Sequence, residues 1–286
     1  MSEQIHIAIM AYNEAANIER CIKSIESATA HPSDLRITVV INGSTDETHS
    51  IVLGLADSEL AINIIDIPLA DKANAWNTYV HGQIDTSVDH FFMDGDVWLP
   101  AGSIDYIKSH WSSDEYAAAS PLPIGVSESY RCQLRDNRWL AGAMYGLSSA
   151  FLTAIREKEF RLPVGFIGDD SAITYIIETD CLDTQQCKKG IQILPATGPV
   201  VPRLGYSLAT LRLLHRRFSR YAERHFQQEA LYQLGRSAST FDLPRHVRQL
   251  APHIRRLGLK KILAVNGIQT LYQPWAYFKA ILPPSD

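Results

Sequence analysis

The stretch Phe91-Phe92-Met93-Asp94-Gly95-Asp96 is the most informative part of this sequence. An apolar run with strand character ends there in two carboxylates separated by one glycine. Mg²⁺ and Mn²⁺ prefer oxygen ligands and commonly use one or two protein carboxylates, while substrate phosphates and water complete the shell. Gly95 leaves room for incoming phosphates. The stretch predicts a Mg²⁺ or Mn²⁺ site formed by Asp94 and Asp96, although such a triplet also occurs in ordinary solvated turns.

Around this stretch, apolar runs of strand character alternate with segments of helical period, which is typical of βα units on a mainly parallel sheet. We predict strands at residues 5–10, 35–41, 61–67, 90–93, 116–120 and within 188–203, and helices at 18–28, 44–55, 72–83, 149–158 and 169–177. Ser44 and Glu47 have the spacing of a capping box. A loop with some helix is expected over 121–138. In such sheets ligands bind outside the carboxyl ends of the strands, where Asp94 lies.

The composition is that of an ordinary globular protein. Of the 286 residues, 46% are hydrophobic and 20% are charged, which excludes disordered and fibrous classes. No signal peptide precedes Ile5 and no apolar run reaches the roughly 18 residues of a membrane span, so we expect a cytoplasmic location. The cysteines lack metal-finger spacing and are expected to be buried, reduced thiols; they are Cys21, Cys132, Cys181 and Cys187.

Charge divides the chain near residue 200. Residues 1–199 carry a net charge of −14 and residues 200–286 a net charge of +10. We expect residues 1–200 to form the sheet domain and residues 201–286 to form a basic appendage of amphipathic helices broken near Gly235 and Gly258. The appendage could meet phosphates, an anionic membrane surface, the acidic domain of its own chain or a second subunit. Nucleic acid is disfavoured as a partner, because no recognised motif accompanies the basic residues.

Four segments give the sequence a family resemblance. They are Ala8-Ile9-Met10-Ala11-Tyr12-Asn13-Glu14, Val39-Val40-Ile41-Asn42-Gly43-Ser44-Thr45-Asp46, Lys72-Ala73-Asn74-Ala75-Trp76-Asn77 and Met93-Asp94-Gly95-Asp96. In this order and at βα spacing they resemble the nucleotide-sugar half of the family-2 glycosyltransferases, over about residues 5–180. The resemblance implies a GT-A fold, which is a Rossmann-like mainly parallel sheet flanked by helices. It also implies metal-dependent transfer of a sugar from a nucleotide-diphosphate sugar to an acceptor hydroxyl.

The resemblance also assigns residues to the donor. The loops after the first two strands lie side by side at the sheet edge, so base and ribose would contact Ala11, Tyr12, Asn13, Glu14, Asn42, Ser44 and Asp46. Lys72, Asp94 and Gly95 would lie near the diphosphate, although a solvated lysine is an alternative for Lys72. A UDP-sugar is the favoured donor. Family members usually have two acidic residues where this chain has Ile41 and Asn42, and an amide offers a base different donors and acceptors.

A second acidic pair, Asp169-Asp170, follows Gly168. It resembles the family's acidic pair at the start of a helix, whose second member is usually the general base. Asp170 would therefore be the base, with Asp169 orienting it or the acceptor, in a single displacement that inverts the anomeric configuration. Acids at a helix N-terminus also have a purely structural use, because they cap free N–H groups and complement the helix dipole.

Three further features complete the interpretation. Residues 141–146 resemble the family's small-residue segment beneath the donor sugar, or else pack tightly as a strand. Trp139 either stacks on a sugar or lies in the core, and the core is favoured. The Gln-x-x-Arg-Trp signature of processive members is absent, which favours a single-addition enzyme. The alternatives are a noncatalytic nucleotide-sugar-binding or scaffold protein, and a sugar-1-phosphate nucleotidyltransferase, whose glycine-rich signature is missing.

Overall fold

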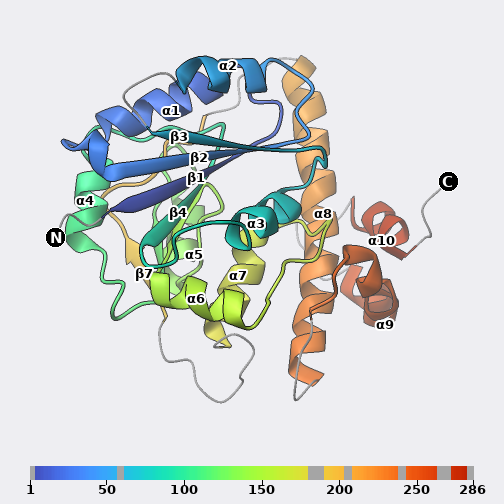
Figure 1. Ribbon diagram of the computed structural model, residues 1–286. Coiled ribbons are helices and arrows are strands. Elements are labelled where there is room, and N and C mark those ends of the chain that lie inside the picture. Colours follow the sequence, from blue (N-terminus) through green and yellow to red (C-terminus); the bar gives the residue numbers. More distant parts are fainter. Residues whose placement is uncertain are drawn as a thin grey trace.

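The computed structural model describes residues 4–56, 61–179, 190–202, 208–237, 243–262 and 272–281 (Figure 1). Its centre is a sheet of seven strands in the order β3-β2-β1-β4-β6-β5-β7. The strands are β1 (Ile5–Ala11), β2 (Leu35–Asn42), β3 (Ile62–Ile67), β4 (Asp89–Asp94), β5 (Ala118–Pro121), β6 (Met144–Leu147) and β7 (Ile191–Leu194). The predicted α/β architecture is confirmed, and β1 to β5 begin and end within a few residues of the expected positions, while β7 lies within the predicted range 188–203. β6 overlaps residues 141–146, where a tightly packed strand was one of two alternatives.

The pairing of the strands places the carboxyl ends of β1, β2 and β4 at one edge. β1 pairs in parallel with β2 and with β4, and β2 pairs in parallel with β3. In this register Ala11 lies opposite Ile41 and Met10 lies opposite Asp94. β6 runs antiparallel to both β4 and β5. The loops that follow β1, β2 and β4 therefore meet, as the parallel topology requires.

Helices cover both faces of the sheet, because side chains alternate along each strand. Ile7 and Ile9 of β1 point into a core shared with α1 (Ile18–Ser27), α2 (Thr48–Leu55) and α4 (Ser103–His110). Ala8 and Met10 point into the opposite core, which is shared with α3 (Lys72–Val80), α6 (Ser149–Glu157) and α7 (Asp169–Glu178). A short 3-10 turn, η1 (Pro32–Asp34), precedes β2. The sheet is thus enclosed on both sides.

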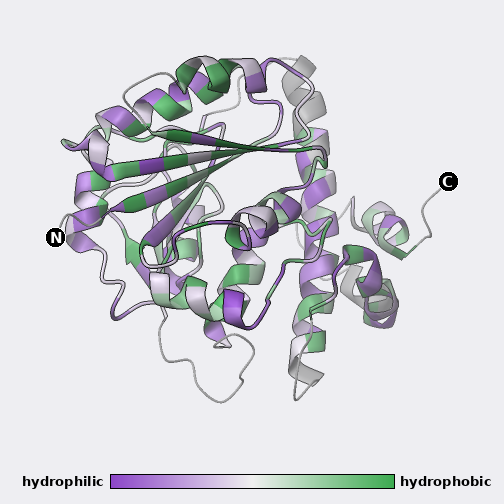
Figure 2. Ribbon diagram, viewed as in Figure 1, coloured by the Kyte–Doolittle hydropathy of each residue, from purple (hydrophilic) through white to green (hydrophobic). Residues whose placement is uncertain are grey.

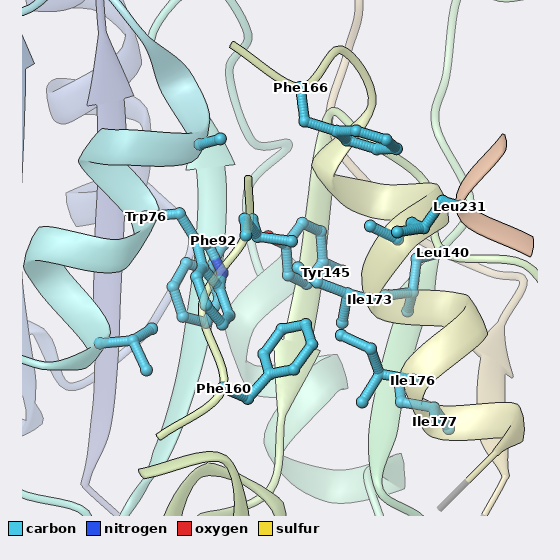
Figure 3. Close-up of a cluster of buried hydrophobic side chains, with 14 of the residues drawn as sticks. Trp76, Phe92, Leu140, Tyr145, Phe160, Phe166, Ile173, Ile176, Ile177 and Leu231 are labelled. Atoms are coloured by element: carbon cyan, nitrogen blue, oxygen red, sulfur yellow. The ribbon is translucent and has the colours of Figure 1, made fainter. Parts of the chain in front are cut away.

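The helices after residue 200 join the same core. They are α8 (Leu208–Ser237), the 3-10 turn η2 (Val247–Leu250), α9 (Ala251–Ile262) and α10 (Gln273–Ile281). Figure 1 shows α8 running along one side of the sheet domain, with α9 and α10 on its outer side. Phe226 and Leu231 of α8 are buried in the cluster that contains Tyr145, and Figure 3 shows Leu231 among the side chains of this cluster. The apolar core therefore continues across the boundary predicted near residue 200.

Along α8, hydrophilic residues alternate with hydrophobic ones, as Figure 2 shows, in keeping with a helix packed on one side. The helix end predicted near Gly235 is confirmed, because α8 ends at Ser237. The break predicted near Gly258 is wrong, because α9 continues through Gly258 to Ile262. A glycine costs a helix only about 1 kcal/mol, and Tyr175 occupies the space that a side chain on Gly235 would need. Among the described residues, no helix is both long enough and apolar enough to cross a membrane.

Several local expectations also need correction. The capping box is wrong: α2 begins after Glu47 with no side-chain cap, and the Ser44 hydroxyl accepts a hydrogen bond from Asn13 N instead. The segment expected as a loop with some helix contains α5 (Glu128–Asn137), which Ser127 caps. Trp139 is 44% exposed rather than in the core. The third predicted helix, α3, ends at Val80 rather than near residue 83.

The cysteine prediction is confirmed only for Cys21, which is a buried free thiol. Cys132 is also free but only partly buried. Cys181 and Cys187 lie outside the described residues.

Candidate active site

Polar side chains bind the loops after β1 and β2 to each other. The Ser44 hydroxyl accepts from Asn13 N at 3.0 Å, and the Asn13 side-chain oxygen accepts from Thr45 N at 2.8 Å. Asp46 accepts from Ala15 N at 3.1 Å and from the Thr48 hydroxyl at 2.5 Å. The side chains of Asn13, Ser44 and Asp46, which we predicted to contact base and ribose, thus shape the loops in this structure.

Other predicted donor-binding residues differ in how much surface they present. Tyr12 is 44% exposed at the sheet edge, whereas Ala11 is fully buried and Asn42 is 4% exposed at the end of β2. Gly43, which follows Asn42, has φ +68 and abuts the backbone of Ala70, where a side chain would collide. On this side of the site, the exposed ring of Tyr12 is an aromatic surface on which a planar ligand could stack.

Asp94, Gly95 and Asp96 continue β4 into the same edge. Gly95 N donates to Met10 O at 3.0 Å, and Asp94 N donates to Ala143 O at 3.1 Å, which fixes this turn between β1 and the segment before β6. A side chain on Gly95 would approach the Cγ of Glu14 at 3.3 Å, so the glycine allows close packing of Glu14. The Asp96 carboxylate forms neither a hydrogen bond nor an ion pair with any residue in the described part of the chain.

Lys72, at the start of α3, joins the two acidic pairs. Its Nζ lies 2.7 Å from Asp94 Oδ1 and 3.2 Å from Asp169 Oδ1, although these aspartates belong to β4 and α7. Burial alone would lower the pKa of this ammonium, but the Asp169 and Asp94 carboxylates outweigh it and raise the pKa above its ordinary value. Asp71 caps α3 by accepting from Asn74 N at 2.7 Å and also accepts from Gly165 N at 2.9 Å, which ties the Lys72 helix to the segment before α7.

The second acidic pair opens α7. Asp169 and Asp170 are 5% and 6% exposed, and the Tyr145 hydroxyl donates to Asp169 Oδ2 at 3.2 Å. Gly168, the residue before them, has φ +99, which lets the chain turn sharply into the helix. A side chain on Gly142 would lie 3.2 Å from Asp170 Oδ2, so this glycine leaves the space beside the carboxylate open.

Arg224 of α8 completes the site and was missed by the sequence prediction. Its Nη2 lies 3.0 Å from both carboxylate oxygens of Asp170. Burial would lower the pKa of this guanidinium, and the charge of Asp170 raises it. Gln227 and Gln228 lie on the same helix: Gln227 Oε1 accepts from Ile167 N at 2.7 Å, and Gln228 Nε2 contacts the Ser171 hydroxyl. The sequence feature that indicates such a contact is the charge reversal near residue 200. One of the predicted partners of the basic residues after this point was the acidic domain of the same chain.

Negative charge is concentrated at the end of β4. Burial, together with the charges of Asp96, Asp94 and Asp46, raises the pKa of Glu14 to about 7 against the hydrogen bond from Asn17. Burial also raises the pKa of Asp94 to about 6; Lys72 opposes this effect, and the neighbouring Asp96 adds to it. In the described part of the chain, no three His, Cys, Asp or Glu side chains are arranged to hold a metal by themselves.

A cation that takes one or two protein carboxylates and completes its shell with phosphate and water suits this donor set. Among the described residues the Asp96 carboxylate is unpaired, and it lies close enough to Asp94 for its charge to raise the pKa of Asp94. By contrast, Asn77 is structural: its amide donates to Leu162 O and accepts from Leu162 N, both at 2.8 Å. The structure therefore brings together Lys72, Asp94, Asp169 and Asp170, and keeps Asn77 out of the site.

Comparison with known proteins agrees with this geometry. Residues 6–146 match the family model described as glycosyl transferase family 2. None of the curated proteins matches the sequence. The structure is similar to a mannosyltransferase from Pyrobaculum calidifontis in complex with GDP-Man and Mn²⁺, with a TM-score of 0.62 and 18% identity over 97% of this chain and 85% of that chain. It is also similar to S. aureus TarS 1–349 in complex with UDP-GlcNAc, with a TM-score of 0.58 and 14% identity over 98% of this chain and 82% of that chain.

At these identities the structural likeness shows the fold, which is that of GT-A glycosyltransferases, and the family match covers the loops after β1, β2 and β4. Through residues 6–146 the chain belongs to glycosyl transferase family 2, and it is a glycosyltransferase with the GT-A fold.

Proposed function

We propose that this glycosyltransferase moves a sugar from a nucleotide-diphosphate sugar to an acceptor hydroxyl by a single inverting displacement. The observation that carries the proposal is the position of Lys72, whose ammonium contacts both Asp94 at the end of β4 and Asp169 at the start of α7. Because of this contact, the strand-end carboxylates and the helix-start carboxylates form one site. A donor bound at the strand ends and an acceptor bound near α7 would therefore lie next to each other.

On the donor side, Asp96 and Asp94 would hold Mn²⁺ or Mg²⁺. The bound cation would supply Lewis-acid stabilisation of the negative charge that develops on the leaving diphosphate, an effect that can contribute several kcal/mol. Lys72 adds a fixed positive charge beside Asp94. Such preorganised charge stabilises a transition state more than it stabilises the ground state. The mannosyltransferase complex with GDP-Man and Mn²⁺ supports this assignment by similarity of fold.

On the acceptor side, Asp170 would act as the general base. A base must be ionised and must reach the hydroxyl that it deprotonates. Arg224 forms an ion pair with Asp170, and the absence of a side chain on Gly142 leaves room beside Asp170 Oδ2 for a bound hydroxyl. As the acceptor oxygen bonds to the anomeric carbon, its proton passes to Asp170 and the bond to the diphosphate oxygen breaks. Asp169, held by Lys72 and Tyr145, would position the acceptor or the base.

A UDP-sugar is our preferred donor and a GDP-sugar is the alternative, since the structurally similar proteins carry one or the other. Tyr12 would contact the base, because it is the aromatic side chain among the predicted base-binding residues and its ring is 44% exposed. One sugar would be added per encounter. The positions corresponding to the processive Gln-x-x-Arg-Trp signature hold Leu214 where the glutamine would be and Arg217-Phe218 at the end.

The test is a thermal-shift screen of UDP- and GDP-sugars with and without Mn²⁺, followed by hydrolysis or transfer assays on those that bind. A ligand that favours the native state raises the Tm, by an amount that grows with its concentration over its Kd. We expect one nucleotide family to raise the Tm more with Mn²⁺ than without it, and to give a product of inverted configuration. Absence of any nucleotide-dependent shift, or a product of retained configuration, would contradict the proposal.

A further inference from the structure

Arg224 uses only part of its hydrogen-bonding capacity. Its Nη2 contacts Asp170, while Nε and Nη1 form no hydrogen bond with any residue in the described ranges. A guanidinium carries five N–H donors in a planar fork, so most of them remain available. The side chain is 29% exposed, which leaves it open toward the site. Partly buried N–H groups of this kind are normally satisfied by a partner.

The fold makes room for this guanidinium. A side chain on Gly168 would lie 2.5 Å from Arg224 Nε, so the arginine lies directly over the backbone that leads into α7. Gly168 also has φ +99, a conformation that side-chain-bearing residues rarely adopt. The positive charge is therefore held next to Asp170 by a backbone arrangement that only glycine allows.

Two tyrosines lie in the same region. Tyr130 on α5 and Tyr221 on α8 are 38% and 45% exposed. Burial raises the pKa of Tyr130 to about 12, and the charges of Asp170, Arg224 and Tyr221 also act on it, which places these four side chains in one electrostatic neighbourhood. Phenol groups donate and accept hydrogen bonds, and their rings pack against sugars or alkyl chains. We call Tyr130, Tyr221 and Arg224 the acceptor subsite.

We propose that the acceptor subsite binds an anionic group of the acceptor, a phosphate or a carboxylate, beside the hydroxyl that Asp170 deprotonates. The proposal rests on the proposed function of this site. Arginine pairs with carboxylate and phosphate through two parallel N–H bonds, and Arg224 has the unused donors to do so. The chain from residue 200 onward carries a net charge of +10, which also favours approach of an anion from this side.

The contact between Arg224 and the anionic group of the acceptor would also free Asp170 to act as the base. While Arg224 donates to Asp170 Oδ2 and lies 3.0 Å from Oδ1, it competes with the acceptor hydroxyl for those oxygens. An anionic group on the acceptor draws guanidinium donors to itself, so a carboxylate oxygen of Asp170 becomes available to the hydroxyl. A neutral acceptor would not draw the guanidinium donors away from Asp170. The subsite would therefore select anionic acceptors through both binding and proton transfer.

The test uses calorimetric titration with glycerol 3-phosphate, glycerol and inorganic phosphate. We expect glycerol 3-phosphate and phosphate to bind the wild-type protein and glycerol not to bind. Arg224→Gln should weaken the binding of glycerol 3-phosphate at least about tenfold, and Arg224→Lys should weaken it less, because lysine keeps the charge without the fork. Arg36→Gln is the matched control, since it removes an exposed guanidinium at the opposite end of the strands and should leave binding unchanged.

Vesicles with and without phosphatidylglycerol distinguish the source of the anionic group. Sedimentation that depends on both Arg224 and phosphatidylglycerol assigns the subsite to a lipid-linked phosphate, whereas binding of glycerol 3-phosphate alone assigns it to a soluble acceptor. The proposal is overturned if glycerol 3-phosphate and phosphate fail to bind the wild-type protein, or bind Arg224→Gln as tightly. If Arg224→Gln does not fold, the comparison of Arg224→Lys with wild type decides. Mn²⁺-dependent UDP or GDP binding, measured in parallel, shows whether only this subsite or the whole proposed function has failed.

Discussion

The two acidic pairs of the site differ in how the chain balances their charge. Asp169 contacts Lys72 and Asp170 contacts Arg224, so each carboxylate at the start of α7 has a cationic partner. At the end of β4, Asp94 shares Lys72 with Asp169, and Asp96 has no ion pair within the described residues. A carboxylate without a counter-charge among others of the same sign favours an external cation. This difference supports the proposal that Asp96, rather than either aspartate of α7, takes an external cation.

The largest effect is expected from Asp170→Asn, which removes the proposed base but keeps the shape of the side chain. Transfer should fall by about a thousandfold, within the range for loss of a general base, while donor binding should change little. Steady-state transfer assays and nucleotide titrations measure the two effects. Asp136→Asn, at an exposed position on α5, is the control and should leave both unchanged. Full transfer by Asp170→Asn would remove this residue from the chemistry.

Lys72→Met removes the cation that the two pairs share. We expect kcat/KM to fall by about a hundredfold, because a preorganised charge beside the developing negative charge is lost. Asp94 would then be free of its ion pair, so Mn²⁺ should raise the Tm of this variant more than the Tm of wild type. Lys158→Met, at the exposed C-cap of α6, is the control. Equal kcat/KM for Lys72→Met and wild type would contradict the claim that Lys72 joins the two acidic pairs into one functional site.

His90, on the same strand as Asp94, should make the stability of the fold depend on pH. This effect must be distinguished from the titration of the active-site carboxylates. Burial lowers the pKa of His90 to about 4, and its Nδ1 lies 2.7 Å from the Tyr79 hydroxyl. The unfolded chain binds the proton at higher pH than the folded chain, so this contribution to stability is complete above pH ~6.5 and is lost as the pH falls toward about 4.

At pH 5 the loss amounts to about 2 kcal/mol. Urea unfolding at pH 7.5 and pH 5 should show a smaller acid-induced loss in His90→Gln than in wild type, whereas His49→Gln, at an exposed histidine, should behave as wild type does. An identical pH dependence in His90→Gln and wild type would show that His90 is not the source.

The smallest effect is expected from Gly168→Ala. Its left-handed backbone costs a side-chain-bearing residue about 1 to 2 kcal/mol, and the new methyl group would push Arg224 away from Asp170. We therefore expect a lower Tm together with weaker transfer. Gly54→Ala is the matched control, since Gly54 lies in α2 with open space around it, and alanine there should stabilise the protein slightly. An unchanged Tm for Gly168→Ala would show that the Arg224 contact does not depend on this glycine.

Much of the sheet could be predicted because each strand of β1 to β4 is an apolar run followed by a segment of helical period. The parallel order then places the ends of those strands together, which is why Asp94 could be assigned to the site edge. The roles of Asn13, Ser44 and Asp46 were harder to predict, because a polar loop side chain can face a ligand or a neighbouring loop, and here they bond the two loops together.

Arg224 shows the limit most clearly. It lies 54 residues from Asp170 in the sequence, and its partner is decided by how α8 packs on the core, through residues such as Phe226 and Leu231. The charge reversal predicted that basic residues after residue 200 could contact acidic residues before it, but it did not identify Arg224. For Trp139 the core was favoured over stacking on a sugar, whereas the left-handed Arg138 ends α5 and leaves the ring on the surface.

The most direct test of the central claim is calorimetric titration of UDP and GDP into wild type, Asp96→Asn and Asp169→Asn, each with and without Mn²⁺. If Asp96 is the carboxylate reserved for the cation, Asp96→Asn will lose the Mn²⁺-dependent part of the nucleotide affinity and keep its Tm. Asp169→Asn will retain that Mn²⁺ dependence. Equal Mn²⁺ dependence in Asp96→Asn and wild type would contradict the account.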